Sequence, residues 1–102
     1  GLINDLAPVH KKLWTIDVLV EGEALFIASS EDKLTIQIGN QRYLVKVTSK
    51  YVSIRFVTNN RTIGGCYSKD FHNPTPNFPV LGTGDTHEVK LYGRTLVKIT
   101  RN

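Results

Sequence analysis

Apolar and polar residues alternate along most of this sequence, from Trp14 almost to the C-terminus. The first alternating run is 14-WTIDVLV-20, in which Trp14 and every second residue after it are apolar. A period of two is typical of a β-strand that buries one of its faces. The pattern therefore predicts that the chain is built from strands.

Similar runs follow, separated by short turn sequences. Gly39-Asn40 predicts a hairpin turn because both residues tolerate positive φ, and Gly64-Gly65 predicts a bulge or twist. Outside the alternating runs we expect an N-terminal arm at 1–12 and a long Pro/Gly-rich loop at 70–85, with room for one short strand. After the first run, we expect strands at residues 24–28, 33–38, 43–47, 52–56, 62–68, 89–91 and 95–99.

Seven or eight short strands, with no convincing amphipathic helix, indicate the all-β class. We expect a small antiparallel β-barrel or β-sandwich, and the pattern leaves the choice between the two open. The length of 102 residues matches one ordinary domain, so we take 1–102 as a single β domain.

Composition adds an expectation about the setting of this domain. The longest apolar runs are far shorter than the roughly 18 residues of a membrane-spanning helix, which excludes such a span. The sequence lacks methionine and begins with Gly1, so we expect a piece processed from a larger precursor or viral polyprotein. Its single cysteine, Cys66, cannot form an internal disulfide, which favours a reducing, cytoplasmic location (host cytoplasm if viral).

The basic charge is concentrated in the second part of the chain. Residues 1–40 carry three lysines and six carboxylates, whereas residues 41–102 carry ten basic and three acidic side chains. The net charge is therefore −3 for the first segment and +7 for the second, in agreement with +4 for the whole chain. Such an asymmetry indicates a polyanionic partner.

No catalytic or metal-binding motif stands out among the reactive side chains. The candidates are His10, His72, His87, Cys66, Asp17, Asp70 and Asp85. They are not surrounded by a nucleophile elbow, a phosphate-cradling glycine motif or a paired metal-ligand spacing. We therefore expect no enzymatic activity, no metal and no cofactor.

Alternation places most basic side chains of the second segment on the outward side of their strands, interleaved with two tyrosines. The predicted nucleic-acid-binding residues are Arg42, Lys46, Lys50, Tyr51, Arg55, Arg61, Lys90, Tyr92, Arg94 and Lys98. Single-stranded nucleic acid requires this combination, because cations follow its phosphates and aromatic rings stack on its bases. Basic residues also occupy the solvent side of ordinary sheets, but a merely soluble sheet mixes both signs of charge. The near absence of acidic residues at these outward positions favours a binding surface.

Several of these segments resemble one known family. The arm 4-NDLAPV-9 is similar to its opening Asn-Glu-Leu-Ser-Pro-Val, 41-QRYL-44 and 54-IRF-56 to its Gly-Arg-Phe-Val and Ala-Arg-Phe strands, and 88-EVKLY-92 to its Lys-Val-Lys-Tyr-Leu-Tyr strand. This family is the single-stranded-RNA-binding replicase subunit of nidoviruses, the ninth non-structural protein of coronaviruses.

The resemblance implies a small barrel that binds single-stranded RNA and serves a polymerase complex, with RNA contacts at Arg42, Arg55 and Lys90. The family also has a C-terminal helix with a Gly-x-x-x-Gly dimer contact and an amino-terminal asparagine. Neither has a counterpart in these 102 residues, so nucleotide transfer to the terminus is not implied.

The sequence thus leads to two functional hypotheses. The first is a non-enzymatic RNA-binding module that recognises single strands, with edge strands that favour a homodimer and a place in a larger protein complex. The second is a β-sandwich that recognises protein or carbohydrate through the loop at 71–85, with contacts from Phe71, His72 and Phe78.

Overall fold

The structure is a computed structural model that describes residues 13–19, 24–28, 31–71 and 77–102, with 24–28 described by their backbone. The predicted N-terminal arm, Val20, the turns at 21–23 and 29–30, His10 and His72 lie outside these residues. Within the described ranges the chain is all-β, as predicted. Its nine strands are β1 (Trp14–Val18), β2 (Ala24–Ala28), β3 (Asp32–Ile38), β4 (Gln41–Val47), β5 (Tyr51–Phe56), β6 (Thr62–Ser68), β7 (Val80–Leu81), β8 (Thr86–Leu91) and β9 (Arg94–Arg101).

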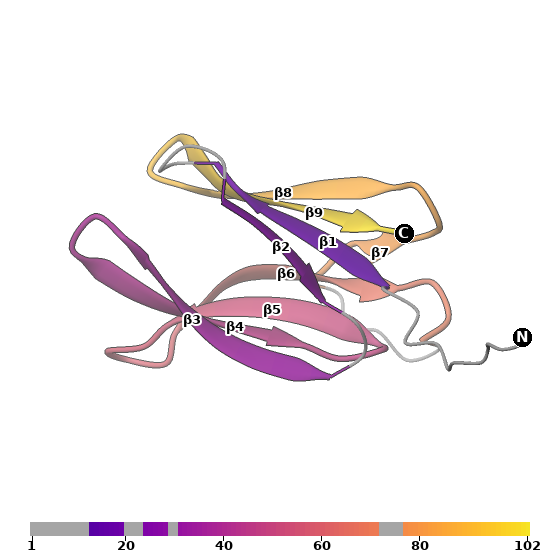
Figure 1. The fold of residues 1–102 in the computed structure, drawn as a ribbon, viewed down its shortest axis with the longest axis horizontal. Helices are drawn as coiled ribbons and strands as arrows, with labels where there is room; N and C mark the ends of the chain where they lie inside the picture. Colours follow the sequence, from indigo (N-terminus) through magenta and orange to yellow (C-terminus); the bar gives the residue numbers. More distant parts are fainter. Residues whose placement is uncertain (1–12, 20–23, 29–30, 72–76) are drawn as a thin grey trace, which may run out of the picture.

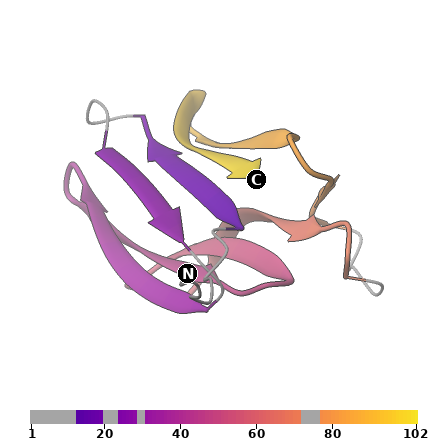
Figure 2. The same cartoon turned by 45° about the vertical axis from the view of Figure 1, so that its right-hand side comes forward.

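The strands form two sheets that lie as two layers, in a sandwich-like arrangement (Figures 1 and 2). One sheet has the order β2-β1-β9-β8, and the other has the order β3-β4-β5-β6-β7. All neighbours pair antiparallel except β6 and β7, which are parallel. The two-residue β7 is the short strand for which the Pro/Gly-rich region had room.

The core lies between the two sheets and is built from the residues that the alternation placed inward. Both sheets contribute to one cluster of buried residues, which includes Trp14, Ile16, Val18, Val45, Val47, Val52, Ile54, Cys66, Val89, Val97 and Ile99. Burial of this apolar surface is the main stabilising contribution to the fold.

Leu96 is a core residue that the alternation did not place inward. The register of β8 and β9 shifts between Val89 and Lys90, so that Val89 lies opposite Val97 and Lys90 opposite Thr95. Leu96 is the extra residue of this bulge, and it is buried while Thr95 is only half-buried. Strict alternation had placed Thr95 inward instead, because a bulge interrupts the period of two.

The two adjacent glycines of β6 serve opposite faces of their sheet. A Cβ atom at Gly64 would lie 2.7 Å from a methyl group of Val89 in the other sheet. A Cβ at Gly65 would collide with the Val52 carbonyl oxygen and lie 2.7 Å from the Phe78 ring. The predicted bulge is also present, because Ile54 pairs with Gly64 but Arg55 pairs with Thr62. Glycine thus permits close approach on both sides of β6.

Polar contacts join the two sheets at one end of the sandwich. The Trp14 indole Nε1–H donates to the Thr48 carbonyl oxygen at 2.9 Å. The buried Arg101 guanidinium donates to Ser68 Oγ at 3.2 Å and to Asp70 Oδ2 at 3.3 Å, and it lies 5.7 Å from the centre of the Trp14 ring. We call this end of the sandwich the closed end. The turns β3–β4, β5–β6 and β8–β9 lie at the opposite end, which we call the open end (Figure 1).

We expect Arg101→Ala to lower the free energy of unfolding by roughly 2–4 kcal/mol, because charged hydrogen bonds across the sheets are lost and Ser68 stays buried. Lys69→Ala, which removes an exposed cation close to the same end, should change it by less than about 0.5 kcal/mol. Urea unfolding followed by tryptophan fluorescence measures both. Equal midpoints for the two variants would contradict a stabilising role for Arg101.

Candidate nucleic-acid interface

The structure separates the predicted binding residues into three groups. The first is on the outward side of the five-stranded sheet, the second on the outward side of the four-stranded sheet, and the third at the β8–β9 turn. Outward faces of two stacked sheets point in opposite directions. The ten residues therefore do not form one continuous surface. The groups are Arg42, Lys46, Lys50, Tyr51, Arg55 and Arg61, then Lys90 and Lys98, then Tyr92 and Arg94.

The first group, together with Lys33, is closely spaced by the strand register. Lys46 of β4 lies directly opposite Lys33 of β3. Arg55 of β5 lies opposite Leu44, so it is diagonal to Arg42 and Lys46, within reach of long side chains. We call the outward side of β3, β4 and β5 the basic face; it carries Lys33, Arg42, Lys46, Tyr51 and Arg55, with Lys50 and Arg61 at its ends.

Lys33 was missed as a candidate because each strand was interpreted alone. The signal was present in the Gly39-Asn40 turn, since a two-residue hairpin fixes the register of both strands. Gly39 has φ +62, and Ile38 pairs with Gln41. Counting back along both strands from that pair places Lys33 opposite Lys46.

Among the residues that the structure describes, no ion pair compensates the charge of the basic face. The structure has two ion pairs among its described residues, Lys90–Glu88 at 3.9 Å and Arg101–Asp70 at 3.3 Å, and neither involves this face. Like charges directly opposite one another destabilise a sheet. Glu31 and Asp32 lie at one corner of the face, where they share a hollow of about 470 Å³ with the two opposed lysines. A bound anion would relieve the repulsion.

The four-stranded sheet differs in this respect. Lys98 lies directly opposite Asp17 on one side and Glu88 on the other. Glu88 also contacts Lys90 and accepts a hydrogen bond from Thr95 Oγ1 at 3.0 Å. Charges of both signs alternate here, as on an ordinary solvated sheet. We therefore leave Lys90 and Lys98 out of the candidate interface.

Arg55 is held in place on the basic face. Its Nη1 donates to Asn60 Oδ1 at 3.3 Å, and its Nε is buried with no hydrogen-bond partner among the described residues. Asn60 itself has φ 64, a left-handed conformation that asparagine tolerates better than most residues. The β5–β6 turn thus positions the guanidinium of Arg55 at the open end of the face.

Aromatic rings cover the part of the five-stranded sheet nearest the closed end. Tyr67 contacts Tyr51 edge-on at 6.2 Å, and it contacts Phe71 at 5.2 Å and Phe78 at 5.4 Å between ring centres. Phe71 and Phe78, two of the residues expected to bind in the loop hypothesis, therefore pack on the sheet. The ammonium of Lys46 lies 5.8 Å from the centre of the half-buried Tyr51 ring. A base can stack there only when this lysine moves aside.

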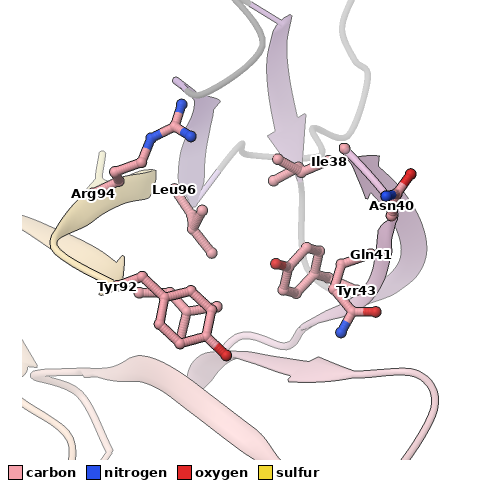
Figure 3. A pocket seen from close by; sticks show the side chains of 9 residues that line it. Ile38, Asn40, Gln41, Tyr43, Tyr92, Arg94 and Leu96 are labelled. Atoms are coloured by element: carbon pink, nitrogen blue, oxygen red, sulfur yellow. The ribbon is translucent and has the colours of Figure 1, made fainter.

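The third group lines a cleft of about 420 Å³ at the open end, between the turns of the two sheets (Figure 3). Tyr92, 89% exposed, lies on one side of it and the buried Tyr43 on the other. The remaining lining residues are Ile38, Gly39, Asn40, Gln41, Leu91, Arg94 and Leu96. This cleft was not foreseen from the sequence, which gave no indication that the β3–β4 and β8–β9 turns meet.

No family model matches this chain, and no curated protein or solved structure matches it at the required significance. The resemblance to the nidovirus subunit therefore stays a prediction.

Three of the side chains considered as catalytic or metal-binding candidates, Cys66, Asp70 and Asp85, are buried or hydrogen-bonded. Burial raises the pKa of the Cys66 thiol to about 12. Asp70 pairs with Arg101, and Asp85 Oδ2 accepts from the Gly82 N–H at 2.9 Å. Burial lowers the pKa of His87, partly offset by Glu88. In the described ranges, no cluster of three His, Cys, Asp or Glu side chains is arranged to hold a metal.

A further finding concerns membranes. The described residues form no helix with the length and apolar character needed to cross a bilayer.

We expect Cys66 to resist thiol reagents in the folded protein, because it is buried and its pKa of about 12 leaves almost no thiolate at pH 8. Ellman's reagent should label it within minutes in denaturant and at least about a hundredfold more slowly in buffer. Rapid stoichiometric labelling of the folded protein would contradict the buried position.

Proposed function

We propose that this protein is a non-enzymatic module that binds single-stranded nucleic acid, RNA in particular, through the basic face. The observation that carries this proposal is the contrast between the two sheets. The basic face gathers Lys33, Arg42, Lys46 and Arg55 without an ion-pair partner among the described residues, whereas Lys98 on the other sheet lies between two carboxylates.

Such a face suits a phosphate backbone physically. Each phosphate neutralised by a lysine or arginine releases a condensed counterion, so binding gains entropy and weakens as salt rises. The flexible side chains of Lys33, Lys46 and Lys50 can follow a single strand without a fixed helical geometry. Tyr51, once Lys46 moves from its ring, adds a stacking surface that does not discriminate between bases.

The resemblance to the nidovirus replicase subunit supports RNA over DNA as the ligand. We include in the proposal that the module is released from a polyprotein and serves a viral replicase complex. The lone buried thiol agrees with a reducing, cytoplasmic compartment, that of the host cell in this setting. β2 and β8 are the edges of one sheet, and β3 and β7 are the edges of the other. We include a homodimer formed through such an edge in the proposal.

Substitutions that each remove one positive charge test the face against the rest of the molecule. We expect Arg55→Ala and Lys46→Ala to weaken binding of single-stranded RNA several-fold and to reduce the slope of log K against log salt by about 0.7 each. Lys98→Ala is the matched control, because it lowers the net charge equally and should change neither value. Fluorescence anisotropy with labelled RNA, over a salt series, measures both.

The same titration with double-stranded RNA and heparin tests specificity. We expect the single strand to bind most tightly at each salt concentration. Equal affinity for all three polyanions, or equal loss in Lys98→Ala and Arg55→Ala, would reject the basic face as a single-strand site and leave only a diffuse effect of net charge.

A further inference from the structure

The cleft at the open end is distinct from the basic face. Gln41 and Tyr43 line the cleft, whereas Arg42, between them in β4, points to the other side of the sheet and belongs to the basic face. A nucleic-acid strand that follows β4 toward the open end must therefore pass around the β3–β4 turn to reach the cleft. The residues that line the cleft determine which ligands it can bind.

Tyr92 occupies a backbone position that is unfavourable for it. The β8–β9 turn has two residues, because Leu91 pairs with Arg94, and both Tyr92 (φ 54) and Gly93 (φ 77) are left-handed. This is the pattern of a type I′ hairpin, where Asn-Gly is the preferred sequence. A tyrosine there is strained, and its 89% exposure means that the ring gains little from packing. The fold alone gives no reason for this residue.

The opposite wall of the cleft combines apolar side chains with two amides, which suits a planar heterocycle. The Tyr43 ring is 4% exposed and is supported by Phe56 at 5.4 Å between ring centres. Leu96 and Ile38 add apolar surface to the lining, and the amides of Asn40 and Gln41 lie on the same side of the cleft as Tyr43 (Figure 3). Apolar walls with a few amides suit a base, whose flat faces stack and whose edges exchange hydrogen bonds.

The hydroxyl group of Tyr43 remains protonated at neutral pH, because its pKa is raised, first by burial and then by the nearby Tyr92. This phenol can therefore donate as well as accept a hydrogen bond. Arg94, which lines the same cleft, adds a cation for the phosphate of the bound nucleotide.

We propose that this cleft takes one unpaired nucleobase of the strand bound on the basic face, stacked against the Tyr92 ring; this inference rests on the proposed function. The amides of Asn40 and Gln41 contact the edge of the base. The cleft thereby supplies the recognition of the base itself that the basic face lacks.

The variant Tyr92→Asn separates binding from folding. It restores the preferred Asn-Gly turn, so its melting temperature should equal or exceed that of the parent protein. We expect its affinity for a single-stranded RNA of about 12 nucleotides to fall about tenfold, with an unchanged salt slope, because a stacked base is lost but no phosphate contact. Tyr92→Phe keeps the ring and should bind within about twofold of the parent.

Mononucleotides test the cleft without the basic face. In ¹⁵N-correlated NMR spectra, each ribonucleoside monophosphate is titrated against the parent protein, with ribose 5-phosphate as the control that lacks a base. We expect the side-chain amide signals of Asn40 and Gln41 to shift with at least one monophosphate and to stay in place with ribose 5-phosphate, whereas the Arg94 signal, which reports on the phosphate, shifts with both.

The outcomes distinguish this inference from the function on which it rests. If Tyr92→Asn binds RNA like the parent, or if no monophosphate moves the amide signals of Asn40 and Gln41, while Arg55→Ala still lowers affinity and salt slope, the base subsite is rejected and the basic face stands. If the parent protein does not bind single-stranded RNA at all, the proposed function is rejected and the subsite with it.

Discussion

The arrangement of this sandwich depends on the fact that its two sheets are tied by polar contacts at one end. Trp14 and Arg101 come from the four-stranded sheet, and Thr48 and Ser68 from the other, so two donors reach across the core at the same place. A buried guanidinium tolerates few positions, because each of its donors needs a partner. The closed end therefore fixes the relative position of the layers. The open end consists of the β3–β4, β5–β6 and β8–β9 turns, and the cleft lies there.

The register of the strands, rather than the number of basic residues, decides on which sheet positive charges lie without carboxylates opposite them. Both sheets carry lysine on their outward sides. In one sheet Lys98 is placed opposite Asp17 and Glu88, and in the other Lys33 is placed opposite Lys46. A shift of two residues in one strand would keep the same residues outward but exchange these partners. The electrostatic difference between the faces is thus a property of pairing.

Much of the fold could be predicted from the sequence, because the alternation of apolar residues specifies strands and their inward sides directly. Leu96 escaped prediction because a bulge changes the period locally. The candidate site was less accessible. Outward orientation was predictable for Arg42 and Arg55, but their separation from Lys90 depends on which strands share a sheet. That assignment is made by pairings between residues far apart in sequence, such as Trp14 of β1 with Arg101 of β9, and periodicity contains no information about them.

The close approach at Gly64 also has a bearing on the shape of the open end. With no side chain at this position, β6 lies against Val89 of β8, two residues before Leu91, which lines the cleft. The absence of a side chain at Gly64 thus allows the two sheets to lie close together at this point. A larger residue there would wedge the sheets apart from within the core. We therefore expect a substitution at Gly64 to change the width of the cleft without any change in its lining residues.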